Sequence, residues 1–238
     1  MKWSYRIARV SGIDIKIHVT FLLLLAWFGW DYYLAGGVAG AAAGVGFTLL
    51  LFLCVLLHEF GHAFAARAFG IRTPDITLLP IGGVARLEGM PEKPWQELVV
   101  AIAGPAVNVV IGGILFFVLA VKITLNSFTG INPFGSGLLM NLLSVNMMLV
   151  VFNAIPAFPM DGGRVLRALL AMKFDYVTAT TIAARVGQVL AVGFAIVSFF
   201  GNSMLLFIAM FVFMGAQQEL AYAKWRAGFL SCRKADIL

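Results

Sequence analysis

Three residues in one short stretch have the types and the spacing of a hydrolytic metal site. The stretch reads HEFGH and runs from His58 to His62, with Glu59 as its second residue. Helix positions four apart lie on one face about one turn apart, so the two imidazoles can share a metal ion. A carboxylate beside them can take a proton from a water molecule at that metal, as in H-E-x-x-H zinc hydrolases. The stretch therefore predicts a zinc site with Glu59 as its base.

This stretch lies inside a long apolar segment. Residues 40–57 carry no charge, and the apolar run continues through residues 63–66. An ionisable group at the centre of a bilayer costs roughly 2–3 kcal/mol and marks function as a default. Bound zinc, which is worth on the order of 10 kcal/mol in structural sites, would offset that cost. The alternative is that His58 and Glu59 pair with each other or face a protein interior, and we favour the metal.

Composition places the chain in a membrane. Of its 238 residues 61% are hydrophobic and 12% charged, against about 25% charged in soluble domains. The net charge of +6 does not indicate a nucleic-acid partner, because the basic residues fall at the ends of apolar segments. The two cysteines form no disulfide framework. The first 17 residues lack the apolar core of a signal peptide, so the first span is expected to remain in the mature protein.

Apolar runs and alternation divide the chain into helices and short hairpins. Alternating residues 4–17 surround Ser11-Gly12 and predict a hairpin at the membrane surface, and two more strands are predicted near 75–79 and 83–88. A short amphipathic helix is expected at 165–174. The predicted spans are 19–34, 40–70, 98–121 with an interruption at Gly104-Pro105, 135–155, 181–200 and 203–222. The expected fold is an all-α polytopic membrane protein of one domain, residues 1–238, with six transmembrane helices and short membrane-associated β-hairpins at the N-terminus and between helices 2 and 3.

Basic residues orient the predicted spans. Of the 17 Lys and Arg residues, all but Lys122 fall on one side of this topology. The positive-inside rule then makes both termini cytoplasmic. Gly70 follows His62 by about 12 Å of helix, so the metal would lie below the cytoplasmic surface, within reach of water.

A third ligand is needed, because a catalytic zinc ion usually has three protein ligands and one open position. Asp161 directly follows a long apolar span and precedes two glycines that allow close backbone approach. Pro156 and Pro159 break the helix, so the carboxylate can turn inward. The alternative is that Asp161 caps a helix that begins near Val165.

Three motifs together resemble the site-2 proteases, peptidase family M50, which are zinc metalloproteases that cut substrates within the membrane. The motifs are HEFGH at 58–62, GPAVN at 104–108 and NAIPAFPMDGG at 153–163. The resemblance implies one Zn²⁺ per chain, bound by His58, His62 and Asp161, with Glu59 as general base. It also implies that Asn153 assists catalysis, since an amide can stabilise developing oxyanion charge. A hydrogen bond between helices is the alternative for Asn153.

The resemblance further implies substrate-binding residues. The segment around Gly82 and Gly83 is expected to form a sheet edge that holds unwound substrate by β-augmentation. The alternative is a surface hairpin that only covers the site. Asn108 is assigned equally to substrate handling and to core support. The chain is expected to be a compact form without PDZ or CBS domains.

The predicted function is that of an intramembrane zinc endopeptidase in regulated intramembrane proteolysis. It would reside in the cell membrane of a bacterium or archaeon and act on transmembrane protein substrates in the lipid bilayer. By resemblance these are anti-sigma factors, membrane-tethered transcription factors or remnant signal peptides. A metal transporter is one alternative, and it predicts several ligand sets along a route. A catalytically inactive homologue that binds membrane proteins is another, and it predicts loss of Glu59 or of a ligand.

Overall fold

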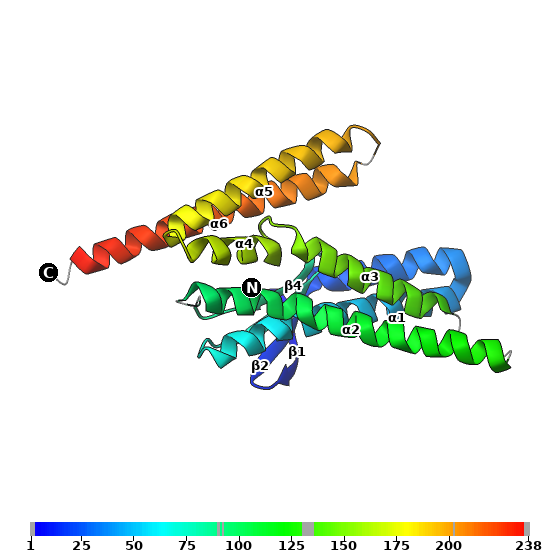
Figure 1. Ribbon diagram of the computed structural model, residues 1–238. Coiled ribbons are helices and arrows are strands. Elements are labelled where there is room, and N and C mark those ends of the chain that lie inside the picture. The colour runs from blue at the N-terminus through cyan, green and yellow to red at the C-terminus, as the bar shows by residue number, and fades with distance from the viewer. Residues whose placement is uncertain (1–2, 90, 92, 130–135, 202, 236–238) are drawn as a thin grey trace. The chain divides into compact units, whose positions relative to one another are not determined.

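The computed structural model describes the chain except residues 1–2, 90, 92, 130–135, 202 and 236–238. It contains two compact units. The first unit comprises Met1–Met90 and Ala103–Val150, and the second comprises Pro91–Ile102 and Val151–Leu238. Five of the described helices are long and apolar enough to cross a membrane, and Figure 1 shows their order along the chain.

A two-stranded hairpin opens the first unit, as the sequence predicts. Strands β1 (Ser4–Val10) and β2 (Ile13–His18) are antiparallel, and Ser11 and Gly12 form the turn between them. Both turn residues have positive φ, at 51° and 85°. Positive φ at both central positions defines the turn whose twist matches that of a hairpin.

The predicted hairpins join into one sheet, which the sequence does not predict. Strand β3 (Asp75–Leu79) pairs in parallel with β2 and antiparallel with β4 (Gly82–Arg86), giving the order β1-β2-β3-β4. Lys16 of β2 donates a hydrogen bond of 2.8 Å to the carboxylate of Asp75 on β3. The ion pair therefore links the two hairpins across the parallel pairing of β2 and β3.

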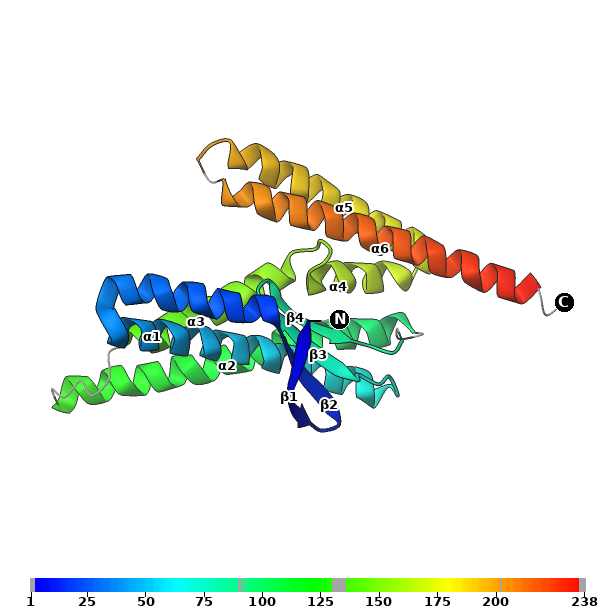
Figure 2. The ribbon, with the colours of Figure 1, turned by 180° about the vertical axis from the view of Figure 1, so that it is seen from behind.

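Helix α1 (Val19–Ala68) is two helical arms joined by a sharp reversal. Gly36 and Gly37 have non-helical backbone angles, and Figures 1 and 2 show the arms running side by side in opposite directions. A Cβ atom at Gly44 of the second arm would overlap the ring of Tyr32 in the first. Small residues thus let the arms approach closely. The first two predicted spans lie in these arms, and the helix ends just before Gly70, as expected.

The predicted interruption at Gly104-Pro105 is wrong. Helix α2 (Pro94–Thr129) is continuous and contains Pro105. A proline removes one intrahelical hydrogen bond, but its φ is close to the helical value, and the long apolar segments on both sides keep their own bonds. The next helix, α3 (Ser136–Ala154), agrees with the predicted fourth span.

The second unit contains the start of α2, the end of α3 and three further helices. Helix α4 (Asp161–Ala171) begins four residues before the predicted start, and is followed by α5 (Tyr176–Ser198) and α6 (Met204–Ala235). Helices α5 and α6 lie antiparallel and side by side in both views (Figures 1 and 2). The segment before α4 packs into the core that these two helices form, and the buried residues are Ala157, Phe158 and Met160 of that segment, Ala183, Ala184 and Ala191 of α5, and Val212 and Ala216 of α6.

Candidate metal centre

The two histidines of the motif face each other on the second arm of α1. Both side chains are buried, and their Nε2 atoms lie 3.1 Å apart. Two nitrogen ligands at about 2.0–2.1 Å from a tetrahedral zinc ion lie roughly 3.3 Å from each other. The separation of His58 and His62 therefore fits a shared zinc ion.

Two glycines let α1 and α2 pack with these rings between them. A Cβ atom at Gly104 of α2 would overlap the ring of His62 and would lie 2.8 Å from Nε2 of His58. A Cβ atom at Gly61 would lie 2.6 Å from the carbonyl oxygen of Ala103. The sequence predicts Gly104 only as a helix break and misses this contact. The sequence feature that could have indicated this contact is the position of Gly104 four residues before Asn108, which places both residues on one face of the helix.

The backbone of strand β4 lies against the side chain of Glu59. A Cβ atom at Gly83 would be 2.5 Å from Cγ of Glu59 and 3.2 Å from its Oε1. Gly82 has a φ of 135°, which favours glycine. Among the described strands β4 pairs only with β3, so its other edge presents backbone groups outside the sheet. The structure thus brings Gly83 and a free strand edge beside the predicted base.

Asn108 is a buried amide on α2. Its side chain is 1% exposed, and neither Oδ1 nor Nδ2 has a hydrogen-bond partner among the described residues. Leaving such a group unsatisfied costs about 1–3 kcal/mol. A buried amide of this kind indicates a place for ordered water or for a polar group of a ligand.

The remaining predicted site residues belong to the second unit. Asp161 is the first residue of α4 and is buried, while Met160 is the residue that caps the helix. The predicted alternative, a cap for a helix from Val165, is therefore wrong. Cβ atoms at Gly162 and Gly163 would each lie 2.6 Å from backbone atoms of the preceding segment, so the glycines let α4 start against it. Asn153 is half-buried near the end of α3.

A buried ionic cluster, which the sequence does not predict, lies on the same helix as Asp161. The Nε atom of Arg167 donates to Glu97 at 2.7 Å and its Nη1 donates to Glu219 at 2.8 Å. Its guanidinium lies 5.0 Å from the ring centre of Phe158 and 5.1 Å from that of Tyr176. Burial by itself would lower the pKa of Arg167, but the two carboxylates outweigh it and raise that pKa. The partners are far away in the chain, so no local pattern reveals the cluster.

Comparison with known proteins identifies the family. The profile of Peptidase family M50 matches residues 46–133 and 135–194, more than half of the chain. This chain belongs to peptidase family M50. It is 38% identical to Zinc metalloprotease MJ0392 of Methanocaldococcus jannaschii over all of this chain and 67% of that protein. It is 30% identical to Putative zinc metalloprotease Rip3 of Mycobacterium tuberculosis over all of this chain and 64% of that protein.

A solved structure has the same fold. The Site-2 Protease from Methanocaldococcus jannaschii is 39% identical and superposes with a TM-score of 0.65, over 92% of this chain and 95% of that one. The chain spans about two thirds of the length of the two curated M50 relatives named above. Family M50 membership makes the protein a membrane-embedded zinc metalloprotease of the site-2 protease type, with Zn²⁺ as its cofactor. The predicted family, enzyme class and cofactor are confirmed.

Proposed function

We propose that the protein is an intramembrane endopeptidase that hydrolyses peptide bonds within or near the transmembrane segments of membrane proteins. One observation carries the proposal. A buried histidine pair with the spacing of a zinc site lies in an apolar helix arm, with the side chain of Glu59 against the backbone of a free-edged strand. Metal ligands, base and a peptide-binding edge are what hydrolysis of an extended peptide in a membrane requires.

His58, His62 and Asp161 are the proposed ligands of one zinc ion. Two imidazoles and one carboxylate form a donor set typical of catalytic zinc, which leaves a position open. All three side chains are buried, and a cation would neutralise the buried carboxylate while the two neutral imidazoles supply nitrogen ligands. When bound, zinc supplies the Lewis acidity for attack on a carbonyl.

Glu59 is the proposed general base. Its carboxylate takes the proton of the attacking water and passes it to the amine that leaves. Asn153 donates its amide hydrogens to the oxyanion that develops at the carbonyl oxygen. Asn108 offers its unsatisfied amide to the substrate backbone, which explains why a buried amide has no protein partner among the described residues.

Substrate binding is assigned to the edge of β4. A helical peptide bond is already hydrogen-bonded and sterically hidden, so the substrate must unwind before attack. An extended segment can add to the free edge of β4 as a further strand. Gly82 and Gly83 let the strand lie close to Glu59, because a side chain at Gly83 would displace the carboxylate.

The proposed topology has six spans, with the two arms of α1 counted separately, and both termini in the cytoplasm. It rests on the bias of basic residues to one side. We also assign the chain to one domain in the cell membrane of a bacterium or archaeon, since the relatives come from both groups. The proposed substrates are single-span membrane regulators or remnant signal peptides.

The test is cleavage of a generic single-span substrate by purified protein in detergent. Wild type is compared with Glu59→Gln and with a sample treated with 1,10-phenanthroline, and bound zinc is quantified in each. We expect cleavage only by untreated wild type, with zinc retained in Glu59→Gln. Normal cleavage by Glu59→Gln would show that another residue is the base. If zinc-loaded wild type cuts none of a panel of single-span substrates, that result would contradict the proposed endopeptidase activity.

A further inference from the structure

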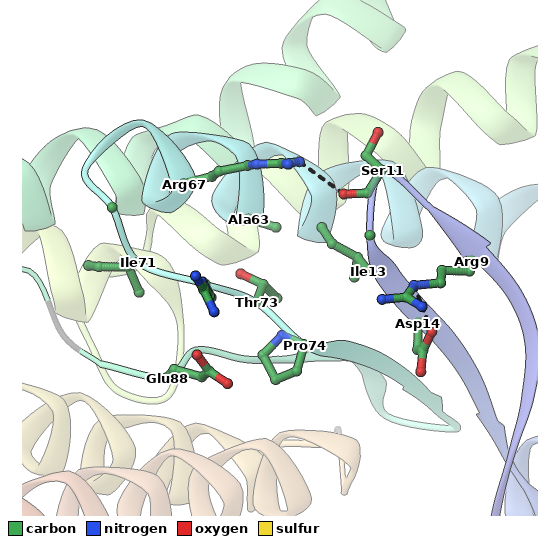
Figure 3. Close-up of a pocket in the computed structure, with 13 residues that line it drawn as sticks. Arg9, Ser11, Ile13, Asp14, Ala63, Arg67, Ile71, Thr73, Pro74 and Glu88 are labelled. Atoms are coloured by element: carbon green, nitrogen blue, oxygen red, sulfur yellow. Dashed lines mark hydrogen bonds and ion pairs between the residues drawn. The ribbon is translucent and has the colours of Figure 1, made fainter.

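A second site lies in the first unit, in a pocket of about 520 Å³. Four segments form it: the turn between β1 and β2 with the strand residues beside it, the last turns of α1, the chain that leads into β3, and Glu88 after β4 (Figure 3). None of the proposed zinc ligands, and none of the proposed catalytic or substrate-binding residues, lines this pocket. The proposed protease activity therefore assigns no role to this pocket.

The lining is rich in arginine. Arg9, Arg67 and Arg72 come from β1, from the last turn of α1 and from the following loop. Nη1 of Arg67 donates to the carbonyl oxygen of Ser11 at 2.9 Å. That bond holds the guanidinium at the rim of the pocket and uses one of its five N–H donors. The site is therefore built to present cationic donors from three separate segments.

Two carboxylates also line the pocket, and one of them is already neutralised. Asp14 lies 3.5 Å from Arg9 and 3.6 Å from Arg6, which is outside the lining. One negative charge is thus shared by two arginines. Glu88 is exposed, and no ion pair involves it among the described residues. Arg67 and Arg72 remain as the cations available to an anionic ligand.

Besides the arginines, a buried hydroxyl group in the pocket also indicates a ligand. Thr73 is 8% exposed, and its Oγ1 has no hydrogen-bond partner among the described residues. Figure 3 shows it in the space between Arg67 and Glu88. A hydroxyl can donate one hydrogen bond and accept two, so a ligand oxygen here would satisfy it.

We infer that this pocket binds a phosphate group. Arginine forks match the oxygens of phosphate, and a phosphate also accepts from a threonine hydroxyl. Apolar Ile13 and Ala63 form part of the same lining, and α1, a membrane-spanning helix, ends five residues after Ala63. The phosphodiester of an anionic phospholipid at the cytoplasmic surface is one source of this group, and soluble phosphate is the other.

An occupied pocket would tie the end of α1 to the N-terminal hairpin. Ala63, in the lining, directly follows His62. The ligand would therefore brace the turn of α1 that comes after the second histidine, without touching the zinc ligands.

The experiment is native mass spectrometry combined with amide hydrogen exchange on the full chain. The protein is placed in nanodiscs of phosphatidylcholine with and without phosphatidylglycerol, and separately in detergent with and without inorganic phosphate. We expect one retained phosphatidylglycerol and slower exchange at residues 67–73 in the anionic discs. Protection by inorganic phosphate alone would assign the pocket to soluble phosphate. Protection by neither ligand would overturn the proposal.

Substitutions of residues inside and outside the pocket test whether the ligand binds there. Arg72→Gln removes an exposed side chain that makes no ion pair among the described residues, so folding should be kept. Affinity for the bound ligand should fall at least about tenfold, as expected for loss of a charged hydrogen bond. Glu88→Gln should strengthen binding, because it removes the unshared negative charge. Lys173→Gln, an exposed cation outside the pocket, is the matched control, and an equal loss in this variant would show that only net charge matters.

Discussion

Gly104 determines how closely α2 can approach the histidine pair. No side chain larger than hydrogen fits there without moving the imidazoles of His58 and His62. The histidines are predictable from the sequence because their spacing lies within one helix turn. The glycine is not, because its contact joins two helices about 40 residues apart in the chain.

Gly104→Ala should weaken zinc binding and cleavage. The methyl group must push the ring of His62 aside, and overpacking of this kind typically costs about 1–3 kcal/mol. We therefore expect zinc affinity to fall roughly 5- to 150-fold, measured by competition with a chelator. Gly113→Ala on the same helix is the control, since no atom lies within 4 Å of its Cβ position. Equal zinc affinity in both variants would contradict the packing argument.

Helix α4 depends on ion pairs that hold it within the second unit. Arg167 is 1% exposed and connects α4 to Glu97 of α2 and Glu219 of α6. A buried charge of this kind is stable only while its partners remain, because desolvation of an unpaired ion is costly. The cluster begins six residues after Asp161, so it also fixes the helix that carries the proposed third ligand.

Arg167→Met should destabilise the protein strongly. It leaves the buried carboxylate of Glu97 and the partly buried carboxylate of Glu219 without their cation, an effect of about 3–5 kcal/mol for a broken buried pair. The expected result is a large fall in Tm in detergent, whereas the exposed Lys173→Met should have almost no effect. The triple variant Arg167→Met, Glu97→Leu and Glu219→Leu should recover much of the loss. If Arg167→Met melts like wild type, the cluster contributes nothing to stability.

The start of α5 gives the protein a small pH dependence. Asp175 caps this helix by accepting from the backbone N–H of Thr178 at 2.9 Å, and that bond lowers the pKa of the carboxyl. A lowered pKa in the folded state stabilises the fold above the usual pKa of 3.8, and the contribution disappears as the pH falls through the lowered value.

Asp175→Asn should remove this pH dependence while keeping the cap, because asparagine is an equally good capping residue. Wild type should have the higher Tm at pH 7, and the difference should begin to shrink below about pH 4 and vanish below the lowered pKa of the folded state. Thermal melting of both proteins over that pH range is the measurement. A difference that stays constant with pH would show that the charge of Asp175 is not involved.

For the strands, the sequence predicts where they lie in the chain but not how the two hairpins pair. Period-2 alternation and turn residues predict all four strands because these signals are local. The parallel pairing of β2 with β3 is not predicted, since it depends on α1 reversing at Gly36 and Gly37 so that the chain returns to the first hairpin. The helix start at Asp161 is also missed, because two following glycines are typical of a loop.

The charge pattern is the basis of the proposed topology of the whole molecule. Lys122 is the one basic residue expected on the far side, and the positive-inside rule needs no knowledge of packing. The orientation is therefore a prediction from the sequence alone, which no contact in the fold enters.

Cysteine labelling tests this topology. Ala35→Cys and Ser203→Cys, in a background with Cys232→Ser, should react with a membrane-impermeant maleimide on intact cells. Ser11→Cys and Lys173→Cys should react only after permeabilisation, because the proposed topology places them on the cytoplasmic side. All four positions are exposed, whereas Cys54 is buried. Labelling of Ser11→Cys on intact cells would reverse the proposed orientation.

The parallel pairing of β2 and β3 also means that the sheet cannot be completed until well after its first hairpin has been synthesised. Lys16 and its partner Asp75 are 59 residues apart, which takes a ribosome about 3–12 s to translate. The first hairpin can form within about 1–10 μs. Strand β2 must then wait with one edge unpaired until both arms of α1 have been inserted. During those seconds the nascent chain carries an unpaired strand edge that can pair with other chains. Chains still being synthesised are therefore the ones that most need protection by a chaperone.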